Sequence, residues 1–241
     1  MSALWEDLST QFYRAFIHDD RWRFIIEGLG NTLLITFFAL IMGTVIGIVV
    51  AIVRTSWDRT SLTMPTGFMK FIFGFFNRLC KIYLTVIRGT PVMLQLMIIF
   101  FIILSSTNKL LVAIIAFGIN SGAYVAEIMR SGIQAVDPGQ FEAGRSLGFS
   151  YIRTMWLVVL PQAFKNILPA LCNEFIVLFK ETAIAGVVGV TDLTRAANII
   201  RGVTFQSLFP LLAVALIYLL FVMLFTMLVG KLERRLKSSE R

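Results

Sequence analysis

The chain has 241 residues, of which 57% are hydrophobic, and its mean hydropathy is +0.81. This composition excludes an ordinary soluble globular protein and indicates one whose solvent is lipid. The net charge of +8 therefore reports first on membrane topology, and we expect no nucleic-acid partner. Two cysteines far apart in sequence and a single histidine predict neither a disulfide framework nor a metal site.

Taken in order, the chain divides into three parts. Residues 1–30 mix polar and aromatic side chains, and we expect an extracytoplasmic, interfacial segment. Residues 31–230 hold five stretches, the fourth of them unusually polar, that are each long enough to cross about 30 Å of hydrocarbon as a helix. These predicted spans are 32–53, 82–104, 110–129, 167–186 and 208–229. Residues 231–241 form a basic tail, so the predicted fold class is an all-α membrane protein with five transmembrane helices.

Two features of the first half are irregular. Gly43 and Gly47 form a small-xxx-small face on the first span, which predicts close approach of another helix, within the bundle or, as the alternative, from another subunit. The Phe-rich stretch 68–76 predicts either an interfacial helix or an extension of the second span.

The second span contains the sequence Arg88-Gly89-Thr90-Pro91. Proline removes a backbone donor and glycine permits a bend, so we expect a kink there with polar groups turned inward.

The distribution of lysine and arginine predicts the orientation. The connector before the second span counted together with Arg88, the region after the third span and the tail hold 15 of these residues, whereas the opposite side holds six. The positive-inside rule then places residues 131–165 and the C-terminus in the cytoplasm and the N-terminus outside.

The cytoplasmic stretch from Gln140 to Phe164 is amphipathic and cannot span a membrane. Residues from Glu142 to Leu147 favour a helix, and Gly148 can adopt the left-handed conformation that closes one. Pro161 loses a backbone bond inside a helix. We therefore predict two short helices that meet at a fixed bend.

Polar side chains inside the predicted spans are the candidates for a transport pathway, because such residues are unfavourable in lipid unless they face a cavity or a partner. On the third span Asn120, Tyr124 and Glu127 share one helix face, although Glu127 can equally pair with Arg130 at i+3. On the fourth span Glu174 lies near the middle and needs a compensating group: a cationic substrate, water, Lys180 or Arg88, with a purely structural ion pair as the alternative. The complete predicted polar belt is Arg88, Thr90, Gln95, Asn120, Ser121, Tyr124, Glu127, Asn173 and Glu174.

No motif of enzymatic chemistry accompanies these residues. The sequence has no Gly-x-x-x-x-Gly-Lys-Ser/Thr phosphate loop, no serine nucleophile elbow and no His-Glu helix motif. We therefore expect no catalytic residue and no cofactor in this chain.

The stretch 140–164 resembles the EAA loop of ABC-transporter permease subunits, the cytoplasmic helix that docks on the ATPase partner. The usual pattern is Glu-Ala-Ala, three residues, Gly, nine residues, Ile, one residue and Leu-Pro; here Gly144 replaces the second Ala and Val158 the Ile. The resemblance implies that the ATPase-coupling residues are Glu142, Ala143, Gly144, Gly148, Leu160 and Pro161.

Further segments are similar to the polar-amino-acid subgroup of these permeases, which takes up residues such as glutamine, glutamate, histidine, arginine and cystine. They include Ile87 to Pro91, Arg130 to Ile133, and Asn173-Glu174-Phe175. The resemblance implies a type I importer fold in a bacterial cell membrane. It also implies a second permease subunit, identical or paralogous, two ATPase subunits that bind ATP and Mg, and an extracytoplasmic solute-binding protein.

Three alternatives remain open from the sequence. The nearest is a permease for methionine or another small solute. A passive channel or secondary carrier could use the same polar belt but would not need the cytoplasmic bend. A structural or signalling membrane subunit would transport nothing.

Overall fold

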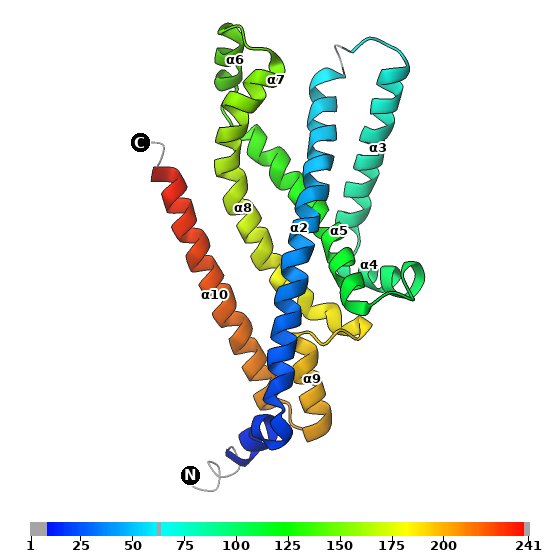
Figure 1. Ribbon diagram of the computed structural model, residues 1–241, viewed down its shortest axis with the longest axis vertical. Helices are drawn as coiled ribbons and strands as arrows, with labels where there is room; N and C mark the ends of the chain where they lie inside the picture. The colour runs from blue at the N-terminus through cyan, green and yellow to red at the C-terminus, as the bar shows by residue number, and fades with distance from the viewer. Residues whose placement is uncertain (1–8, 62–63, 239–241) are drawn as a thin grey trace. The chain divides into compact units, whose positions relative to one another are not determined.

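The computed structural model describes residues 9–61 and 64–238, and within these ranges the ordered elements are all helical, with no β-strand. Figure 1 shows the helices along the chain. Two short turns, η1 (Tyr13–Ile17) and η2 (His18–Asp20), precede the long helix α2 (Trp22–Thr60). The remaining elements are α3 (Phe68–Gly89), α4 (Val92–Ile98), η3 (Ile99–Ile103), α5 (Lys109–Gln134), α6 (Pro138–Ser146), α7 (Tyr151–Thr154), η4 (Met155–Val159), α8 (Leu160–Glu181), η5 (Thr182–Val188), α9 (Leu193–Thr204) and α10 (Leu208–Ser238).

The chain folds into two compact units, each assembled from segments that are distant in sequence. Unit 1 combines the described part of Met1–Ala39 with Val92–Phe117 and Ile176–Met227. Unit 2 combines Leu40–Pro91, Gly118–Phe175 and the described part of Leu228–Arg241.

The core of unit 1 is built on the amphipathic helix α9. Its apolar residues Leu193, Ala196, Ala197 and Ile200 recur at helical spacing and are fully buried. They pack with residues of α2 and α10, among them Ile25 and Val214. The residues between the fourth and fifth predicted spans therefore include a buried helix of their own.

The core of unit 2 depends on close approach of α2 and α5. A Cβ atom added at Gly43 would lie 2.9 Å from Cβ of Ser121, and one added at Gly47 would lie 2.5 Å from Cγ1 of Val125. Only glycine permits this separation, so the predicted role of the Gly43 and Gly47 face is confirmed. Figure 1 shows α3 beside the second half of α2, where Nη1 of Arg54 donates a 3.0 Å hydrogen bond to Oδ1 of Asn77.

The helix of the second predicted span begins before residue 82, in agreement with the second of the two alternatives for the Phe-rich stretch. The single helix α3 begins at Phe68, so the Phe-rich stretch is an extension of this helix and not a separate interfacial one. The helix breaks as predicted: α3 ends at Gly89, Thr90 is extended, and α4 begins at Val92. Because proline cannot donate to the preceding turn, the chain leaves the helix at this point.

Within the described residues, three helices are long and apolar enough to cross a membrane, namely α2, α5 and α10. The broken pair of α3 with α4 and η3 makes a fourth if it is counted as one span. Helix α8 has 22 residues but is not among them. Its hydropathy is lowered by polar residues such as Asn173 and Glu174, which are the same residues that mark it as a candidate pathway helix.

Candidate functional site

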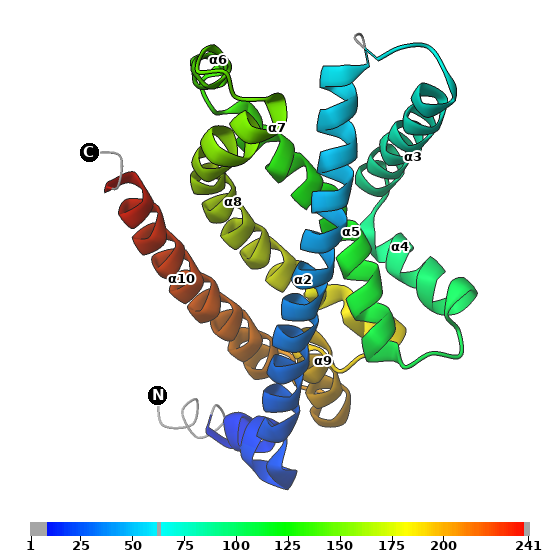
Figure 2. The ribbon, with the colours of Figure 1, turned by 45° about the horizontal axis from the view of Figure 1, so that its top comes forward.

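Helices α6 and α7 with the turn between them, residues 138–154, form a folded-back segment of unit 2 that we call the bent segment. Figure 2 shows it between the ends of α5 and α8. Asp137 caps α6, where its Oδ1 accepts a 2.8 Å hydrogen bond from the Gly139 backbone N–H, and Pro138 occupies the first turn. Ser150 caps α7 in the same way through Arg153 N–H.

The turn between these helices has the conformation that the sequence predicts. Gly148 has φ +83°, the left-handed region that side chains disfavour, and its N–H bonds the Arg145 carbonyl at 2.9 Å. The next N–H, that of Phe149, bonds the Gly144 carbonyl at 3.2 Å. The bend is therefore set by backbone hydrogen bonds and by the one residue type that tolerates this φ without strain.

The close packing around Gly144 explains why glycine takes the place of the second alanine of the Glu-Ala-Ala pattern. It is buried, and an added Cβ would lie 2.6 Å from Cγ2 of Thr154 on α7. An alanine would push the two helices apart. Glu142 and Ala143 are exposed, and Leu147 beside the bend is 76% exposed. The bent segment thus exposes apolar side chains together with charges of both signs, Glu142 on one hand and Arg145 and Arg153 on the other.

The second predicted short helix differs from expectation, because α7, the π-helical turn η4 and α8 follow one another without a break. Leu160 begins α8 and Pro161 is its second residue. The Leu160 N–H donates a hydrogen bond to the Met155 carbonyl five residues earlier, as in a π-helix. This wider helical turn is a local adjustment that accommodates the missing N–H of Pro161. The bent segment therefore leads directly into the helix that carries Glu174.

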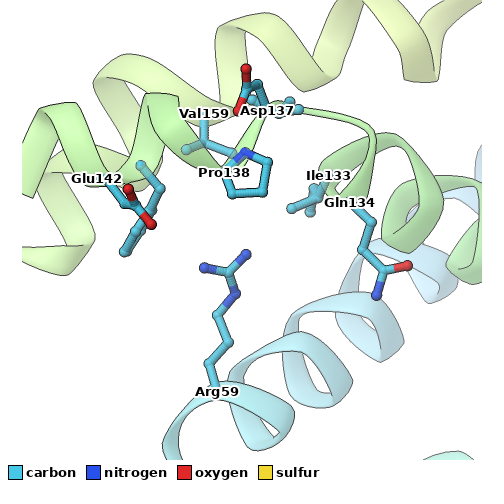
Figure 3. Close-up of a pocket in the computed structure, with 9 residues that line it drawn as sticks. Arg59, Ile133, Gln134, Asp137, Pro138, Glu142 and Val159 are labelled. Carbon is cyan, nitrogen blue, oxygen red and sulfur yellow. The ribbon is translucent and has the colours of Figure 1, made fainter.

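A groove of about 260 Å³ lies beside α6 (Figure 3). The Arg59 side chain, from the last turn of α2, points into it toward Pro138, with Glu142 on one side and Gln134 on the other. The Arg59 guanidinium also lies over the rings of Phe141 and Tyr151. The sequence analysis did not single out Arg59, because no local pattern links it to residues more than eighty positions away.

The polar face of α5 is only partly accessible. Asn120 and Ser121 are buried, whereas Tyr124 is 37% exposed. Glu127 pairs with Arg130, as the local alternative predicts, and Arg130 Nε lies 3.2 Å from Glu127 Oε2.

Arg88 joins this group from α3. Its Nη1 lies 3.8 Å from Oε2 of Glu127, and its guanidinium carbon lies 5.7 Å from the centre of the Tyr124 ring. A neighbouring cavity of about 200 Å³ is lined by Glu127, Arg130 and Arg54. Two carboxylates, that of Glu127 and that of Asp58 near Arg130, therefore accompany three guanidinium groups, so this part of unit 2 carries a small excess of positive charge.

Glu174 has a different partner from those proposed on sequence grounds. Its Oε1 accepts a 2.8 Å hydrogen bond from the Ser121 hydroxyl on α5. The ion pair of Arg88 is with Glu127. The structure thus brings Ser121 together with Glu174, and Arg88 together with Tyr124 and Glu127.

The remaining residues of the predicted belt are less closely grouped. Thr90 donates a 2.8 Å hydrogen bond to the Val86 carbonyl of its own helix, and Asn173 is exposed next to Glu174. Gln95 is buried on α4 and belongs to unit 1.

Asp192 is a buried carboxylate that the sequence analysis did not single out. It is 0% exposed and caps α9, with Oδ1 accepting a 2.9 Å hydrogen bond from Arg195 N–H. Burial raises the pKa of Asp192 to about 6, against the lowering effect of that hydrogen bond. The adjacent backbone is held to α2, since Leu193 N–H donates to the Thr32 hydroxyl at 3.1 Å and Asn31 Nδ2 donates to the Thr191 carbonyl at 2.8 Å.

Comparison with known proteins gives a consistent set of relatives. Residues 43–238 match the family described as binding-protein-dependent transport system inner membrane component. The chain is 40% identical over 221 residues to the arginine transport system permease protein ArtQ of Bacillus subtilis, covering 90% of this chain and 94% of that protein. It is 35% identical to the glutamine transport system permease protein GlnP of Escherichia coli K12, covering 88% of this chain and 93% of that protein.

Solved structures agree with these relatives. A chain from a crystal structure of an amino acid ABC transporter with histidines aligns with a TM-score of 0.77 at 42% identity, covering 88% of this chain and 94% of that one. A chain of the MetNI methionine ABC transporter in an inward-facing conformation aligns with a TM-score of 0.74 at 20% identity, covering 90% and 98%. At 20% identity, the alignment with the methionine transporter supports only a shared fold.

Proposed function

The chain belongs to the family of inner membrane components of binding-protein-dependent transport systems, and on that premise we propose that it forms the translocation pathway of an ATP-driven importer of polar amino acids. It is a multi-pass inner-membrane protein with the type I ABC importer permease fold, a transport component rather than a catalytic one. The proposed substrate class is supported by relatives that are named as arginine and glutamine permeases.

In the proposed topology the chain crosses the membrane five times, with the N-terminus outside and the C-terminus in the cytoplasm. Helix α8 is the fourth span in this arrangement, although its polar residues lower its hydropathy. Support comes from the excess of lysine and arginine in the connector, the region around the bent segment and the tail.

The bent segment is the proposed docking element for the ATPase. Glu142, Ala143 and the exposed Leu147 offer a small surface that combines one negative charge with apolar contacts. The observation that carries this proposal is the left-handed Gly148, because a bend held by local backbone bonds transmits displacement as a rigid body. Leu160 and Pro161 then pass this motion directly into α8, and Gly144 keeps α6 packed on α7.

The proposed pathway follows the polar belt already described. Arg88, Tyr124 and Glu127 form one polar group and Ser121 with Glu174 forms another, and both lie in unit 2. Closure of the ATPase dimer would move α8 and so alter access to Glu174, which is an alternating-access mechanism. Thr90, Asn120 and Asn173 are the further proposed members in unit 2, and Gln95, which lies in unit 1, is a separate candidate.

The proposed assembly contains a second permease subunit, two ATPase subunits that hold ATP and Mg, and an extracytoplasmic solute-binding protein. This chain itself would bind no cofactor. The family description supports a binding protein in general terms, and the bent segment supplies the surface on which an ATPase would dock.

Reconstitution tests the proposal. The permease, its ATPase and its binding protein are placed in proteoliposomes, and uptake of labelled amino acids is measured with ATP, without ATP and with an imposed ion gradient. We expect uptake that requires both ATP and the loaded binding protein. Uptake that persists without the ATPase would identify a channel or secondary carrier. Thermal-shift measurements of the binding protein against amino acids, methionine included, would identify the substrate.

A further inference from the structure

The bent segment is connected to the rest of unit 2 at more places than its two chain ends. Chain continuity joins it to α5 through residues 135–137 and to α8 through η4. A side-chain hydrogen bond also links α8 to α6, since Gln162 Nε2 donates to Gln140 Oε1 at 3.0 Å. A further connection runs to α2, a helix that is distant in sequence, through Arg59.

The contact of Arg59 involves both helices of the bent segment. Its guanidinium carbon lies 5.1 Å from the centre of the Phe141 ring on α6 and 5.8 Å from that of Tyr151 at the start of α7. The two rings are themselves 5.2 Å apart. One cation therefore bridges the aromatic residues on either side of the Gly148 bend, within the range of cation–π attraction.

This arrangement is not explained by charge pairing. Asp137 and Glu142 line the same groove, yet within the described part of the chain Arg59 forms no ion pair with either of them. Its position in the last turn of α2 does favour a positive charge through the helix dipole. Any cation would satisfy that preference, whereas a planar guanidinium is suited to lie against two rings at once.

We propose that Arg59 is a positioning residue for the bent segment, holding Phe141 and Tyr151 against the end of α2 so that displacement of α6 and α7 is also transmitted to α2. The proposal rests on the proposed function for its consequence in transport. Its structural part, the connection between α2 and the bent segment, is supported by the contacts of Arg59 with the Phe141 and Tyr151 rings. Because α2 packs closely on α5 at Gly43 and Gly47, motion delivered at Arg59 would reach the polar face of α5.

The experiment uses the assembled transporter in proteoliposomes and measures uptake and ATP hydrolysis together. Arg59→Ala should lower the number of substrate molecules imported per ATP by roughly fivefold to thirtyfold, the size expected for loss of two cation–π contacts at an exposed position. Arg59→Lys should recover part of the loss. Arg78→Ala, which removes one exposed positive charge from α3, is the matched control and should leave the ratio unchanged.

A double-mutant comparison separates the ring contacts from the helix dipole. The double variant Phe141→Leu with Tyr151→Leu should lower the number of substrate molecules imported per ATP about as much as Arg59→Ala does. Adding Arg59→Ala to this double variant should lower that number little further. Fully additive losses, or a ratio within twofold of wild type for Arg59→Ala, would overturn the proposal.

Hydrogen exchange distinguishes failure of this proposal from failure of the proposed function. In the purified complex, Arg59→Ala should speed amide exchange in residues 138–154 relative to both wild type and Arg78→Ala, whether or not the complex transports amino acids. Unchanged exchange there would refute the positioning role even in a working importer. Faster exchange in a complex without ATP-driven uptake would refute the proposed function and leave the connection intact.

Discussion

The hydroxyl of Ser121 on α5 donates a 2.8 Å hydrogen bond to Oε1 of Glu174 on α8, joining two residues 53 positions apart in sequence. Ser121 is fully buried, so its hydroxyl is fixed by its surroundings. The negative charge of this oriented carboxylate is the feature that a cationic or ammonium group on a substrate would recognise.

Replacing Glu174 with Gln tests this role. The glutamine carbonyl can still accept from Ser121, so the fold should be retained while the negative charge is lost. We expect uptake of cationic amino acids to fall about tenfold, the loss typical of a charge-assisted hydrogen bond, and uptake of neutral ones to fall less. Competition assays in proteoliposomes measure the preference, and co-purification of the ATPase checks assembly. Unaltered rate and preference would make Glu174 a structural residue.

A second prediction concerns the bend at Gly148. Gly148→Val forces a β-branched side chain into φ +83°, which should destabilise the bend by about 1–2 kcal/mol even though no neighbouring atom lies near the new Cβ. Gly148→Asn is the matched control, since asparagine tolerates the left-handed region. We expect stimulation of ATP hydrolysis by the loaded binding protein to fall in the valine variant and to survive in the asparagine variant. Full stimulation with valine would show that the bend is not required for coupling.

The close approach of α2 to α5 gives a third prediction. Gly47→Ala should destabilise the permease by roughly 1–3 kcal/mol, because the new methyl group would overlap Val125. Gly30→Ala on the same helix meets no atom within 4 Å and should leave stability unchanged or slightly raised. Thermal unfolding of the purified protein in one detergent compares the two. Equal shifts of the unfolding temperature in Gly47→Ala and Gly30→Ala would contradict tight packing at Gly47.

Asp192 makes stability depend on pH. Burial raises the pKa of this carboxyl to about 6 from an ordinary value of 3.8, so the folded state favours the protonated form. The ionised carboxylate lowers the free energy of unfolding. This loss of stability is absent below about pH 4, grows between pH 4 and pH 6, and reaches its full size of roughly 3 kcal/mol above pH 6. Asp192→Asn, which can still cap α9, should therefore stabilise the protein at pH 8 and not at pH 4.

Thermal unfolding at the two pH values measures this effect. Glu27→Gln removes an exposed carboxylate from the first turns of α2 and serves as the control. We expect its effect on thermal unfolding to be small compared with that of Asp192→Asn at pH 8. A stabilisation by Asp192→Asn of the same size at pH 4 and pH 8 would contradict the assigned cause.

The sequence alone determined those features of the fold that depend on residues close together along the chain. The apolar runs placed the helices α2, α5 and α10, the proline placed the break between α3 and α4, and the glycine placed the left-handed turn at Gly148. Each is a property of backbone geometry or local hydropathy. The pairing of Glu127 with Arg130, one turn apart, belongs to the same class.

Only the tertiary structure decided which distant side chains meet. Arg88 is paired with Glu127, Glu174 accepts from Ser121, Gly144 packs on Thr154, and Arg59 lies over Phe141 and Tyr151. Each of these depends on the rotation and separation of packed helices, which a single sequence leaves open because many polar pairs could compensate one another equally well. The helices were thus determined by the solvent and the backbone, and the partners of their polar groups by packing.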